Sequence, residues 1–379
     1  MIVTEKDGVR AEIRMLREGW DGKECFVHAR TAASPDGRRL ITTQKLNVEG
    51  DDFFGILHTS VSTDGGETWS ELREDPAFEP AIRNGLRQVC CDMTPMYHKK
   101  TGKFLATGHI AQYQLGDLVP VDSLMSRRVT PYAVFDWEKG SFGPVKQIAM
   151  PDGERFADCG SGCSQCWETP DGDILVPICF GEVVNGKKES RKSKAMVIRC
   201  SFDGEELRCE ELGNVLAVPE EVRGIGECSV MGLGGKYYLT VRGDTHGYFC
   251  VSEDGLRFTQ PDLWRWEDGE IVPTYNTQSH FFTLGGKLYL VYTRKNGNND
   301  HVFRHRAPLF ATEVNTETMR LVREREFICA PERGARLGNF GAAVVSESEA
   351  LVIVTEWMQP KGCERYGSNN AMWMCGVRR

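Results

Sequence analysis

The chain has 379 residues, 40% of them hydrophobic, and a formal net charge of −8. Its basic residues are scattered and outnumbered by acidic ones, which argues against a nucleic-acid partner or an anionic membrane surface. Residues 1–20 lack the apolar core of a signal peptide and no apolar run is long enough for a membrane span, so we expect a cytoplasmic protein.

Six segments along the chain repeat one pattern: a strand, a tight turn and an apolar strand. The turns are 51 to 70 residues apart, and a four-stranded blade with its loops takes about 40 to 60 residues. Six such units use the whole chain, so the sequence predicts an all-β, six-bladed β-propeller, a single domain over residues 1–379. In chain order, the turns are expected at Gly37, Gly102, Gly172, Gly235, Gly286 and Glu349.

Helix patterns are scarce in this sequence. Two short stretches, residues 117–126 and 219–222, are the helix candidates. The last predicted strand lies within residues 369–379, and we expect it to close the ring with the N-terminal segment.

Residues 61–71 read VSTDGGETWSE. Asp-Gly supplies the positive φ angles of tight turns, and short Ser and Asp side chains bond nearby backbone N–H groups. Weaker copies start at Ser201 and Ser252. The pattern resembles the Asp-box of BNR-repeat, sialidase-type β-propellers, which implies a structural role in the outer hairpin of a blade, with Trp69 packed against it.

The chain contains 14 cysteines. Without a signal peptide, we expect reduced thiols rather than disulfides. The cluster CGSGCSQC, with Cys159, Cys163 and Cys166, lacks the paired C-x-x-C spacing of zinc sites and has no histidine nearby. We therefore expect no metal and no cofactor.

Polar residues stand at the start of every predicted inner strand. In a propeller these starts converge near the axis, where they form a pocket. In chain order they are His28 and Arg30, Asp92, Asp158 and Gln165, Glu227, then Asn276, Gln278 and His280, and finally Asn339. From this set we expect Asp92, Gln165, Gln278 and Asn339 to contact the substrate.

Glu227 is followed fifteen residues later by Arg242, across a predicted Gly-Gly turn. The hairpin brings both to the same end, where an ordinary ion pair is one interpretation. The arrangement also resembles the fourth blade of exo-sialidases. That resemblance implies that Glu227 activates the nucleophile and that Arg242 binds the substrate carboxylate, as the planar fork of guanidinium allows.

The same resemblance implies two further arginines on the carboxylate. Arg306 precedes a strand as the family's blade-five arginine does, with Arg304 and Arg294 as competitors. Arg30 is the candidate for the first arginine, about three residues out of register with the family's Phe-Arg-Ile-Pro motif. Glu356 matches the carboxylate that steadies this first arginine.

The acid/base aspartate of sialidases lies in the loop before the first Asp-box, where this chain has Asp51 and Asp52. Sialidases use a blade-six tyrosine as nucleophile, but the matching sequence here is GNFGAA, with Phe340 in place of a tyrosine. Tyr275 and Tyr366 are the alternatives from neighbouring positions.

The fifth unit carries a dense polar cluster. Its members are His280, Asn299, Asp300, His301, Arg304, His305 and Arg306. Histidine has a near-neutral pKa that suits proton transfer, so His280 is a further catalytic candidate.

Four functions are compatible with this sequence. The first is a sialidase-like hydrolase that cleaves a terminal acidic sugar from a small glycoside or oligosaccharide. The second is a polysaccharide lyase or hydrolase acting on uronates, with His280 and a tyrosine as base and acid. The third is a non-catalytic carbohydrate-binding propeller, and the fourth is a protein scaffold, which would not explain six polar strand starts.

Overall fold

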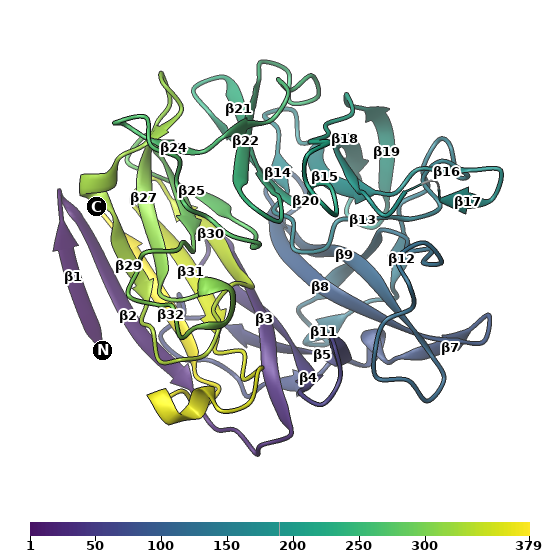
Figure 1. Cartoon of the computed structure of the whole chain (residues 1–379), viewed down its shortest axis with the longest axis horizontal. Coiled ribbons are helices and arrows are strands. Elements are labelled where there is room, and N and C mark those ends of the chain that lie inside the picture. The colour runs from purple at the N-terminus through teal and green to yellow at the C-terminus, as the bar shows by residue number, and fades with distance from the viewer. Residues whose placement is uncertain (189) are drawn as a thin grey trace.

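The computed structural model describes residues 1–188 and 190–379. Six sheets of four to six strands, antiparallel except for one short parallel pair, surround a central axis and form the predicted six-bladed β-propeller (Figure 1). A seventh, two-stranded sheet, β16 (Val183–Val184) with β17 (Lys187–Lys188), projects from the third blade.

The first three blades follow one another in chain order. Blade one consists of β3 (Glu24–Ala33), β4 (Arg39–Asn47), β5 (Phe53–Ser62) and β6 (Arg73–Glu74). Blade two consists of β7 (Ala81–Arg83), β8 (Leu86–His98), β9 (Lys103–Gln114), β10 (Pro131–Asp136), β11 (Ser141–Phe142) and β12 (Lys146–Gln147). Blade three consists of β13 (Cys159–Gly160), β14 (Trp167–Glu168), β15 (Ile174–Phe180), β18 (Lys194–Phe202) and β19 (Leu207–Leu212).

The last three blades complete the ring. Blade four consists of β20 (Gly226–Leu233), β21 (Lys236–Arg242), β22 (Gly247–Ser252) and β23 (Asp262–Leu263). Blade five consists of β24 (Arg265–Trp266), β25 (His280–Leu284), β26 (Lys287–Tyr292), β27 (Leu309–Asn315), β28 (Arg320–Leu321) and β29 (Phe327–Ala330). Blade six consists of β30 (Phe340–Ser346), β31 (Glu349–Thr355), β32 (Met372–Arg378), β2 (Val9–Arg17) and β1 (Ile2–Lys6).

The two ends of the chain meet in blade six. Strand β2 pairs antiparallel with β32, with Arg10 opposite Arg378, so N-terminal strands complete a C-terminal blade (Figure 1). This is the expected closure, and it pairs strand edges that would otherwise be open.

Each of the six predicted turns lies in the inner hairpin of a blade. Gly102, for example, joins β8 to β9 with φ +67°, and Gly235 joins β20 to β21 with φ +81°. The two helix candidates are wrong: residues 117–126 and 219–222 form turns and bends. A stretch of this length that contains Pro120 or Pro219 loses a backbone donor and is too short for a stable α-helix.

Four 3₁₀ turns are the helical elements of the described chain. They are η1 (Pro76–Phe78), η2 (Phe303–His305), η3 (Arg323–Arg325) and η4 (Cys363–Tyr366). None of the helices in the described residues is long and apolar enough to cross a membrane.

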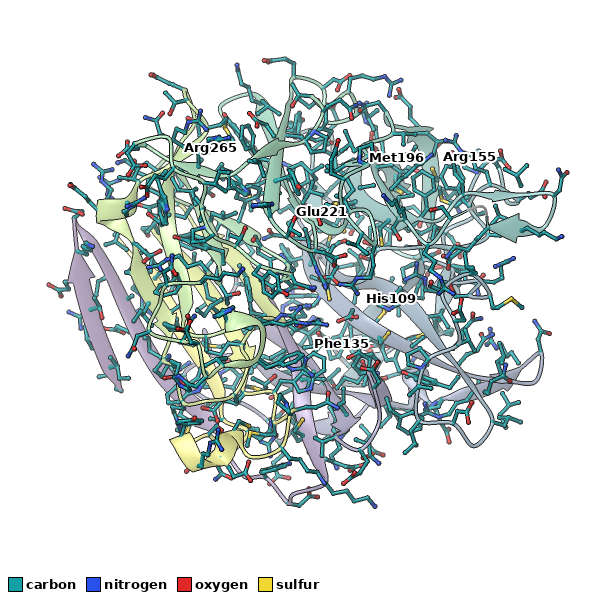
Figure 2. All side chains as sticks on the ribbon, in the orientation of Figure 1. His109, Phe135, Arg155, Met196, Glu221 and Arg265 are labelled. Atoms are coloured by element: carbon teal, nitrogen blue, oxygen red, sulfur yellow. The ribbon has the colours of Figure 1, made fainter. Side chains whose placement is uncertain are left out.

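Apolar side chains fill the spaces between neighbouring blades. Leu105 and Tyr132 of blade two, for instance, share a cluster with Ile174 and Val176 of blade three. Figure 2 shows His109 nearer the middle of the ring and Arg155 and Arg265 nearer its rim. The packed blades therefore hold the axial ends of their inner strands in fixed positions.

The VSTDGGETWSE segment forms the turn between β5 and β6. The Ser62 hydroxyl accepts from Gly66 N at 2.9 Å, and Asp64 accepts from Thr68 N at 3.0 Å. Trp69 Nε1 donates to the Gly66 carbonyl oxygen at 3.1 Å. The segment around Ser252 bonds in a similar way between β22 and β23.

Candidate functional site

A β-bulge interrupts the inner strand of blades one, two and four, after Val27 in β3, after Cys91 in β8 and after Gly226 in β20. The residues at the bulges, His28, Asp92 and Glu227, have φ angles of 57°, 54° and 47°. A bulge with a left-handed residue redirects a side chain away from the regular alternation of a strand. All three side chains thereby face the central pocket.

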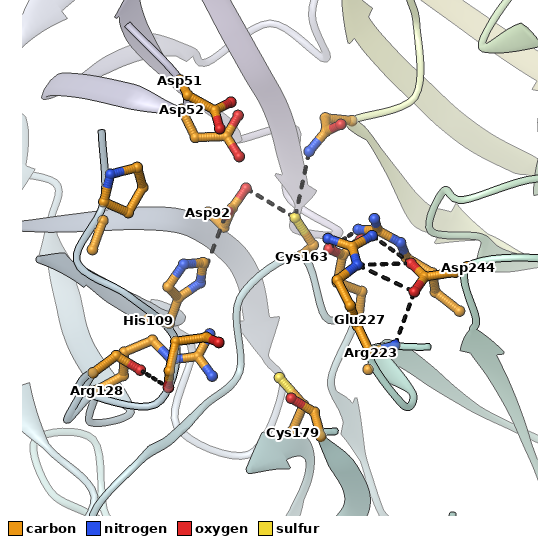
Figure 3. A pocket seen from close by; sticks show the side chains of 18 of the residues that line it. Asp51, Asp52, Asp92, His109, Arg128, Cys163, Cys179, Arg223, Glu227 and Asp244 are labelled. Atoms are coloured by element: carbon orange, nitrogen blue, oxygen red, sulfur yellow. Dashed lines mark hydrogen bonds and ion pairs between the residues drawn. The ribbon is translucent and has the colours of Figure 1, made fainter. Parts of the chain in front are cut away.

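The pocket at this end of the axis has a volume of about 800 Å³. Residues from all six blades line it. Figure 3 shows Asp51 and Asp52 on one side, Glu227 and Asp244 on the other, and Cys163 between them.

The structure brings eight of the thirteen predicted site residues to this pocket. They are Asp51, Asp52, Asp92, Glu227, Arg242, Arg304, Arg306 and Asn339. The other five, which do not line it, are Arg30, Gln165, Gln278, His280 and Glu356.

Four of these five form a buried polar column in the centre of the ring. Arg30 Nη2 donates to Gln278 Oε1 at 3.1 Å, and Gln278 Nε2 contacts His280 Nε2 at 2.8 Å. Gln165 bonds to both backbone groups of Phe281, which ties blade three to blade five. The side chains of Arg30, Gln278 and His280 thus pair with one another, and that of Gln165 pairs with the backbone, instead of lining the pocket.

His280 is fully enclosed in this column, at 1% exposure. Burial lowers its pKa well below the ordinary value, and the nearby Arg30 charge lowers it further. Its Nδ1 lies 2.6 Å from the Ser229 hydroxyl. His280 therefore supports the structure and cannot reach a ligand in the pocket.

Glu356 does not pair with Arg30 in the structure. Its carboxylate accepts from the backbone N–H groups of Asn369 and Ala371 at 2.8 and 3.0 Å, and from Trp373 Nε1 at 3.2 Å. Its ion pair is with Arg333 at 3.3 Å. Glu356 thus orders the loop before β32.

Glu227 and Arg242 form an ion pair inside the pocket. In the β20–β21 hairpin Arg242 pairs with Gly226, and Glu227 is the next residue along β20. The hairpin therefore places the Arg242 and Glu227 side chains side by side. A second pair stands beside it, with Arg223 Nε 2.9 Å from Asp244 Oδ1.

Three arginines of the pocket have no carboxylate partner among the residues that the structure describes. Within the described residues, no carboxylate oxygen lies within 4.0 Å of the guanidinium nitrogens of Arg304, Arg306 or Arg336. Arg306 and Arg336 are only 3% and 6% exposed. Buried charges without a counter-ion are costly, so this group is suited to receive an anion.

The charges of these arginines repel one another. Burial lowers the pKa of Arg306 well below its ordinary value, and Arg242 and Arg336 lower it further. Burial also lowers the pKa of Arg336 to about 10, although Asp52 opposes the change. Sequence reasoning missed Arg336, because it precedes the sixth inner strand by four residues and matches no family position.

Asp52 stands at the mouth of the pocket with φ 46°. Its carbonyl oxygen accepts from the Tyr113 hydroxyl at 2.6 Å, which anchors the loop. Desolvation by the surrounding protein raises the pKa of Asp52 above its ordinary value, although the residue remains exposed to solvent. A carboxyl with a raised pKa is suited to general-acid chemistry.

Asp92 is enclosed by two histidines and a thiol. Its Oδ1 lies 2.5 Å from His28 Nδ1, its Oδ2 lies 3.6 Å from His109 Nδ1, and Cys163 Sγ donates to Oδ1 at 2.9 Å. Burial alone would raise the pKa of Asp92, but His28, His109 and Arg30 hold it far below the ordinary value. His109 was missed because it lies in the middle of β9, the second strand of its blade, and not at the start of an inner strand.

His109 also explains the glycines of CGSGCSQC. A Cβ built on Gly162 would lie 1.7 Å from His109 Nδ1, and one on Gly160 would lie 2.5 Å from His109 Cβ. The segment must therefore lack side chains where the imidazole packs against it.

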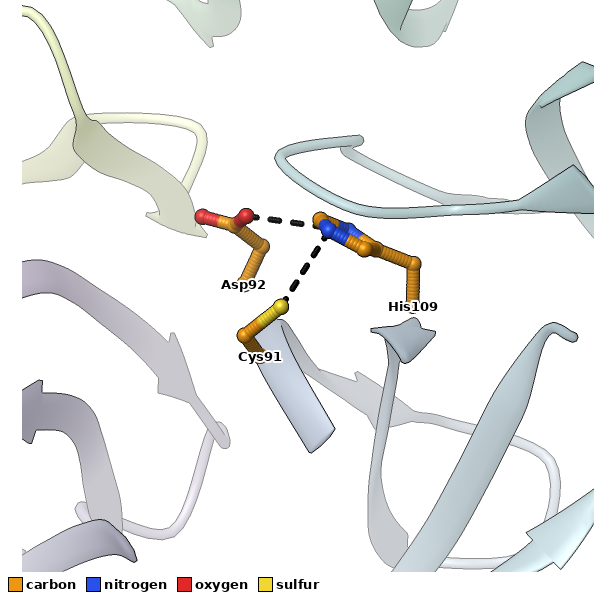
Figure 4. Close-up of side chains that lie close together, drawn as sticks. All are labelled: Cys91, Asp92 and His109. Atoms are coloured by element: carbon orange, nitrogen blue, oxygen red, sulfur yellow. Dashed lines mark hydrogen bonds and ion pairs between the residues drawn. The ribbon is translucent and has the colours of Figure 1, made fainter. Parts of the chain in front are cut away.

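Cys91, Asp92 and His109 come close enough together to be considered as metal ligands (Figure 4). Cys91 Sγ lies 3.2 Å from His109 Nε2, whereas Asp92 Oδ2 lies 3.6 Å from His109 Nδ1. One ion takes only one nitrogen of a ring, and burial raises the pKa of the Cys91 thiol well above its ordinary value. We therefore assign no metal to this cluster.

The place of the missing tyrosine is occupied by other groups. Phe340 is fully buried against the His280 ring, and Asn339 accepts from Arg306 Nη1 at 3.2 Å. Tyr366 packs against His301, and Tyr275 lies beside His305. Among the described residues, no tyrosine lines the pocket.

Most of the polar cluster of blade five lies outside the pocket. Asn299 is buried and donates to backbone carbonyls of its own loop, for example that of Ala307. His301 contacts Glu332 at 3.0 Å, and His305 contacts Asp300 at 3.6 Å. Only Arg304 and Arg306 of this cluster line the pocket.

The fold is that of the sialidase-type six-bladed β-propeller. Trypanosoma rangeli sialidase superposes with a TM-score of 0.60 at 14% identity, over 94% of this chain and 55% of that one. Hadza microbial sialidase Hz136 superposes with a TM-score of 0.63 at 12% identity, over 93% of this chain and 65% of that one. This chain thus spans less than two thirds of the length of either sialidase.

A protein of unknown function from Dyadobacter fermentans is similar over its whole length. Its TM-score is 0.67 at 14% identity, over 98% of this chain and 100% of that one. No family model matches this chain, and no curated protein matches it in sequence.

Proposed function

We propose that this protein is a glycoside hydrolase that removes a terminal acidic sugar from a small glycoside. The observation that carries the proposal is the group formed by Arg304, Arg306 and Arg336, which lines the pocket with no carboxylate partner in the described part of the chain. A planar carboxylate fits such guanidinium groups through paired hydrogen bonds and relieves their mutual repulsion. Sialidase structures of this fold with bound sialic acid support a ligand of this class.

Two carboxyl groups supply the chemistry of the proposed reaction. Asp52, whose pKa is raised, donates its proton to the glycosidic oxygen as the bond to the anomeric carbon breaks. Glu227 faces it across the pocket and accepts a proton from the water that attacks that carbon (Figure 3). The products are the free acidic sugar and the alcohol, and one water is consumed.

Direct attack by water is the step that distinguishes this proposal from the tyrosine mechanism of sialidases. Trypanosoma rangeli sialidase has been solved as a covalent intermediate with a difluorosialic acid. The absence of a tyrosine among the described pocket residues supports a route without that intermediate here. The lyase alternative loses its proposed base, because His280 is buried in the central column.

The test is an activity screen on aryl glycosides of sialic acids, related keto-acids and uronates. Aglycone release and the absorbance of unsaturated sugars are followed in parallel, and binding of the free acids is measured by calorimetry. We expect aglycone release from at least one acidic glycoside and none from neutral ones. An unsaturated product would establish a lyase instead, and binding without turnover would leave a carbohydrate-binding propeller.

A further inference from the structure

Asn276 lies behind the arginines of the pocket and contacts four of them. Its side-chain oxygen Oδ1 accepts from Arg242 Nη2, from Arg223 Nη2 at 3.2 Å and from Arg304 Nη1 at 3.4 Å. Its main-chain carbonyl oxygen accepts from Arg306 Nε at 3.1 Å. One residue thus connects guanidinium groups of blades four and five.

The geometry fixes the orientation of this amide. Guanidinium nitrogens only donate, so the oxygen of Asn276 must face them, and its Nδ2 points towards Asp244 Oδ1 at 3.4 Å. Asn276 is 9% exposed and does not line the pocket, so it acts on a ligand only through the arginines. Its φ angle of 47° is one that asparagine and aspartate adopt more readily than other side chains.

The charge of this residue matters more than its shape. Aspartate would satisfy the same backbone conformation and accept the same hydrogen bonds, but it would add a negative charge within reach of three arginines. Glu227 and Asp244 already pair with Arg242 and Arg223. A third carboxylate here would neutralise the charge that Arg304 offers to a ligand.

We propose that Asn276 is a positioning residue that gathers the arginines with a neutral acceptor and so preserves their positive charge for an anionic ligand. This inference rests on the proposed function, since it gives the arginine group the role of anion receptor. It adds that the site selects ligands by net negative charge, and that the selection depends on a residue the ligand never touches.

The test compares the wild-type protein with Asn276→Asp, Asn276→Ser and the control Asn298→Asp. Asn298 also has a left-handed φ angle, of 55°, and is exposed on the β26–β27 loop without lining the pocket, so its variant adds the same charge outside the pocket. Binding of inorganic sulfate and of D-glucuronate is measured by calorimetry at low ionic strength, and folding by circular dichroism and thermal melting.

We expect Asn276→Asp to weaken sulfate binding at least tenfold while Asn298→Asp changes it less than twofold. Asn276→Ser, which loses the acceptor but stays neutral, should fall between the wild type and Asn276→Asp. Wild-type sulfate affinity in a folded Asn276→Asp variant would overturn the inference, as would weaker binding by Asn276→Ser than by Asn276→Asp. If Asn276→Asp does not fold, an unchanged affinity in Asn276→Ser overturns it equally.

The sulfate measurement separates this inference from the proposed function. Sulfate binding that Asn276→Asp weakens, together with no cleavage of any acidic glycoside, would uphold the anion receptor and reject the hydrolase. Cleavage of acidic glycosides with equal kcat and KM in wild type and Asn276→Asp would uphold the hydrolase and reject the role of Asn276.

Discussion

Arg242 donates to the Glu227 carboxylate from the opposite strand of the same hairpin, at the axial end of blade four. The two side chains are only 14% and 26% exposed, so water screens the pair weakly. Glu227 is thereby held in one orientation within a pocket that is otherwise rich in arginine. Asn276, which accepts from both Arg242 and Arg304, connects this pair to the proposed anion receptor.

Replacing Glu227 with Gln should abolish turnover while ligand binding persists. The amide cannot accept the proton from the attacking water, and general-base catalysis contributes about 10²–10⁴-fold to rates. The affinity for an acidic sugar should stay equal or increase, because a negative charge leaves the pocket. Steady-state kinetics and calorimetry check both effects, and unchanged kcat would remove Glu227 from the mechanism.

Replacing Arg304 with Gln should weaken binding of an acidic sugar at least tenfold, about 1.4 kcal/mol. Arg304 has no carboxylate partner within 4.0 Å in the described chain, so its loss should leave the melting temperature nearly unchanged. The control is Arg208→Gln, an exposed arginine of blade three that pairs with Asp203. Equal affinities in the two variants would contradict the receptor role.

Replacing Asp52 with Asn should slow cleavage most for glycosides with poor leaving groups. An aryl leaving group needs little protonation, whereas an alkyl one depends on the acid. Asp171→Asn, on an outer turn, is the control for the charge change. A uniform loss over both leaving-group classes would show that Asp52 is not the proton donor.

The raised pKa of Asp52 also predicts a pH dependence. In the wild type, kcat/KM should fall as pH rises through this pKa, because the proton donor is lost. The folded state holds this proton more tightly than the unfolded state, so the contribution to stability is present below pH 3.8 and decreases as pH rises through the raised pKa. The Asp52→Asn variant should lack this contribution to the pH dependence of stability.

Replacing Asp158 with Asn should destabilise the protein by about 3 kcal/mol. The carboxylate is fully buried between Arg128 Nε at 2.8 Å and Lys188 Nζ at 2.5 Å, and the change leaves two cations without a partner. Denaturant unfolding at pH 7 measures the loss, with Asp171→Asn as the exposed control. A loss below about 0.5 kcal/mol would mean that the pair contributes nothing net.

The same carboxylate should govern stability in acid. Burial by itself raises the pKa of Asp158, but Arg128 and Lys188 outweigh it and bring the pKa to about 2. Its contribution is therefore complete above the unfolded value of 3.8 and is lost as pH falls towards 2. As pH falls from 5 to 2, the free energy of unfolding should decrease more steeply in the wild type than in Asp158→Asn.

Replacing Trp69 with Ala should lower the free energy of unfolding by about 2 kcal/mol without changing ligand affinity. The indole is partly buried against the hydrophobic cluster of blades one and six, and its N–H bonds to Gly66. Denaturant unfolding measures the loss of stability, and calorimetry measures the ligand affinity. A change in ligand affinity would contradict the separation of this turn from the pocket.

The repeat of the sequence was sufficient to predict the fold. Each unit carries a turn that needs positive φ or a polar hairpin, such as Gly102 or Gly235, between strands with apolar faces. The residues that favour a turn and the alternation of polar and apolar residues along a strand are local properties, so a few neighbouring residues reveal them. The two helix candidates failed for the opposite reason: weak local preference yielded to the loops required between blades.

The pocket was predicted only in part. Glu227 and Arg242 share a hairpin, so their proximity follows from local pairing. His280, in contrast, lies in the buried column although its strand start is as polar as that of Glu227. The difference arises from the bulges, which turn some side chains to the pocket and leave others in the axis.

The sequence by itself therefore determined the number of blades, their hairpins and the presence of polar residues at the axis, because these depend on contacts within one unit. Tertiary structure alone decided which of those residues face the pocket, that Arg336 joins Arg304 and Arg306, and that His28 and His109 enclose Asp92. These relationships join different blades, and a shift of one residue in strand register reverses the direction of a side chain.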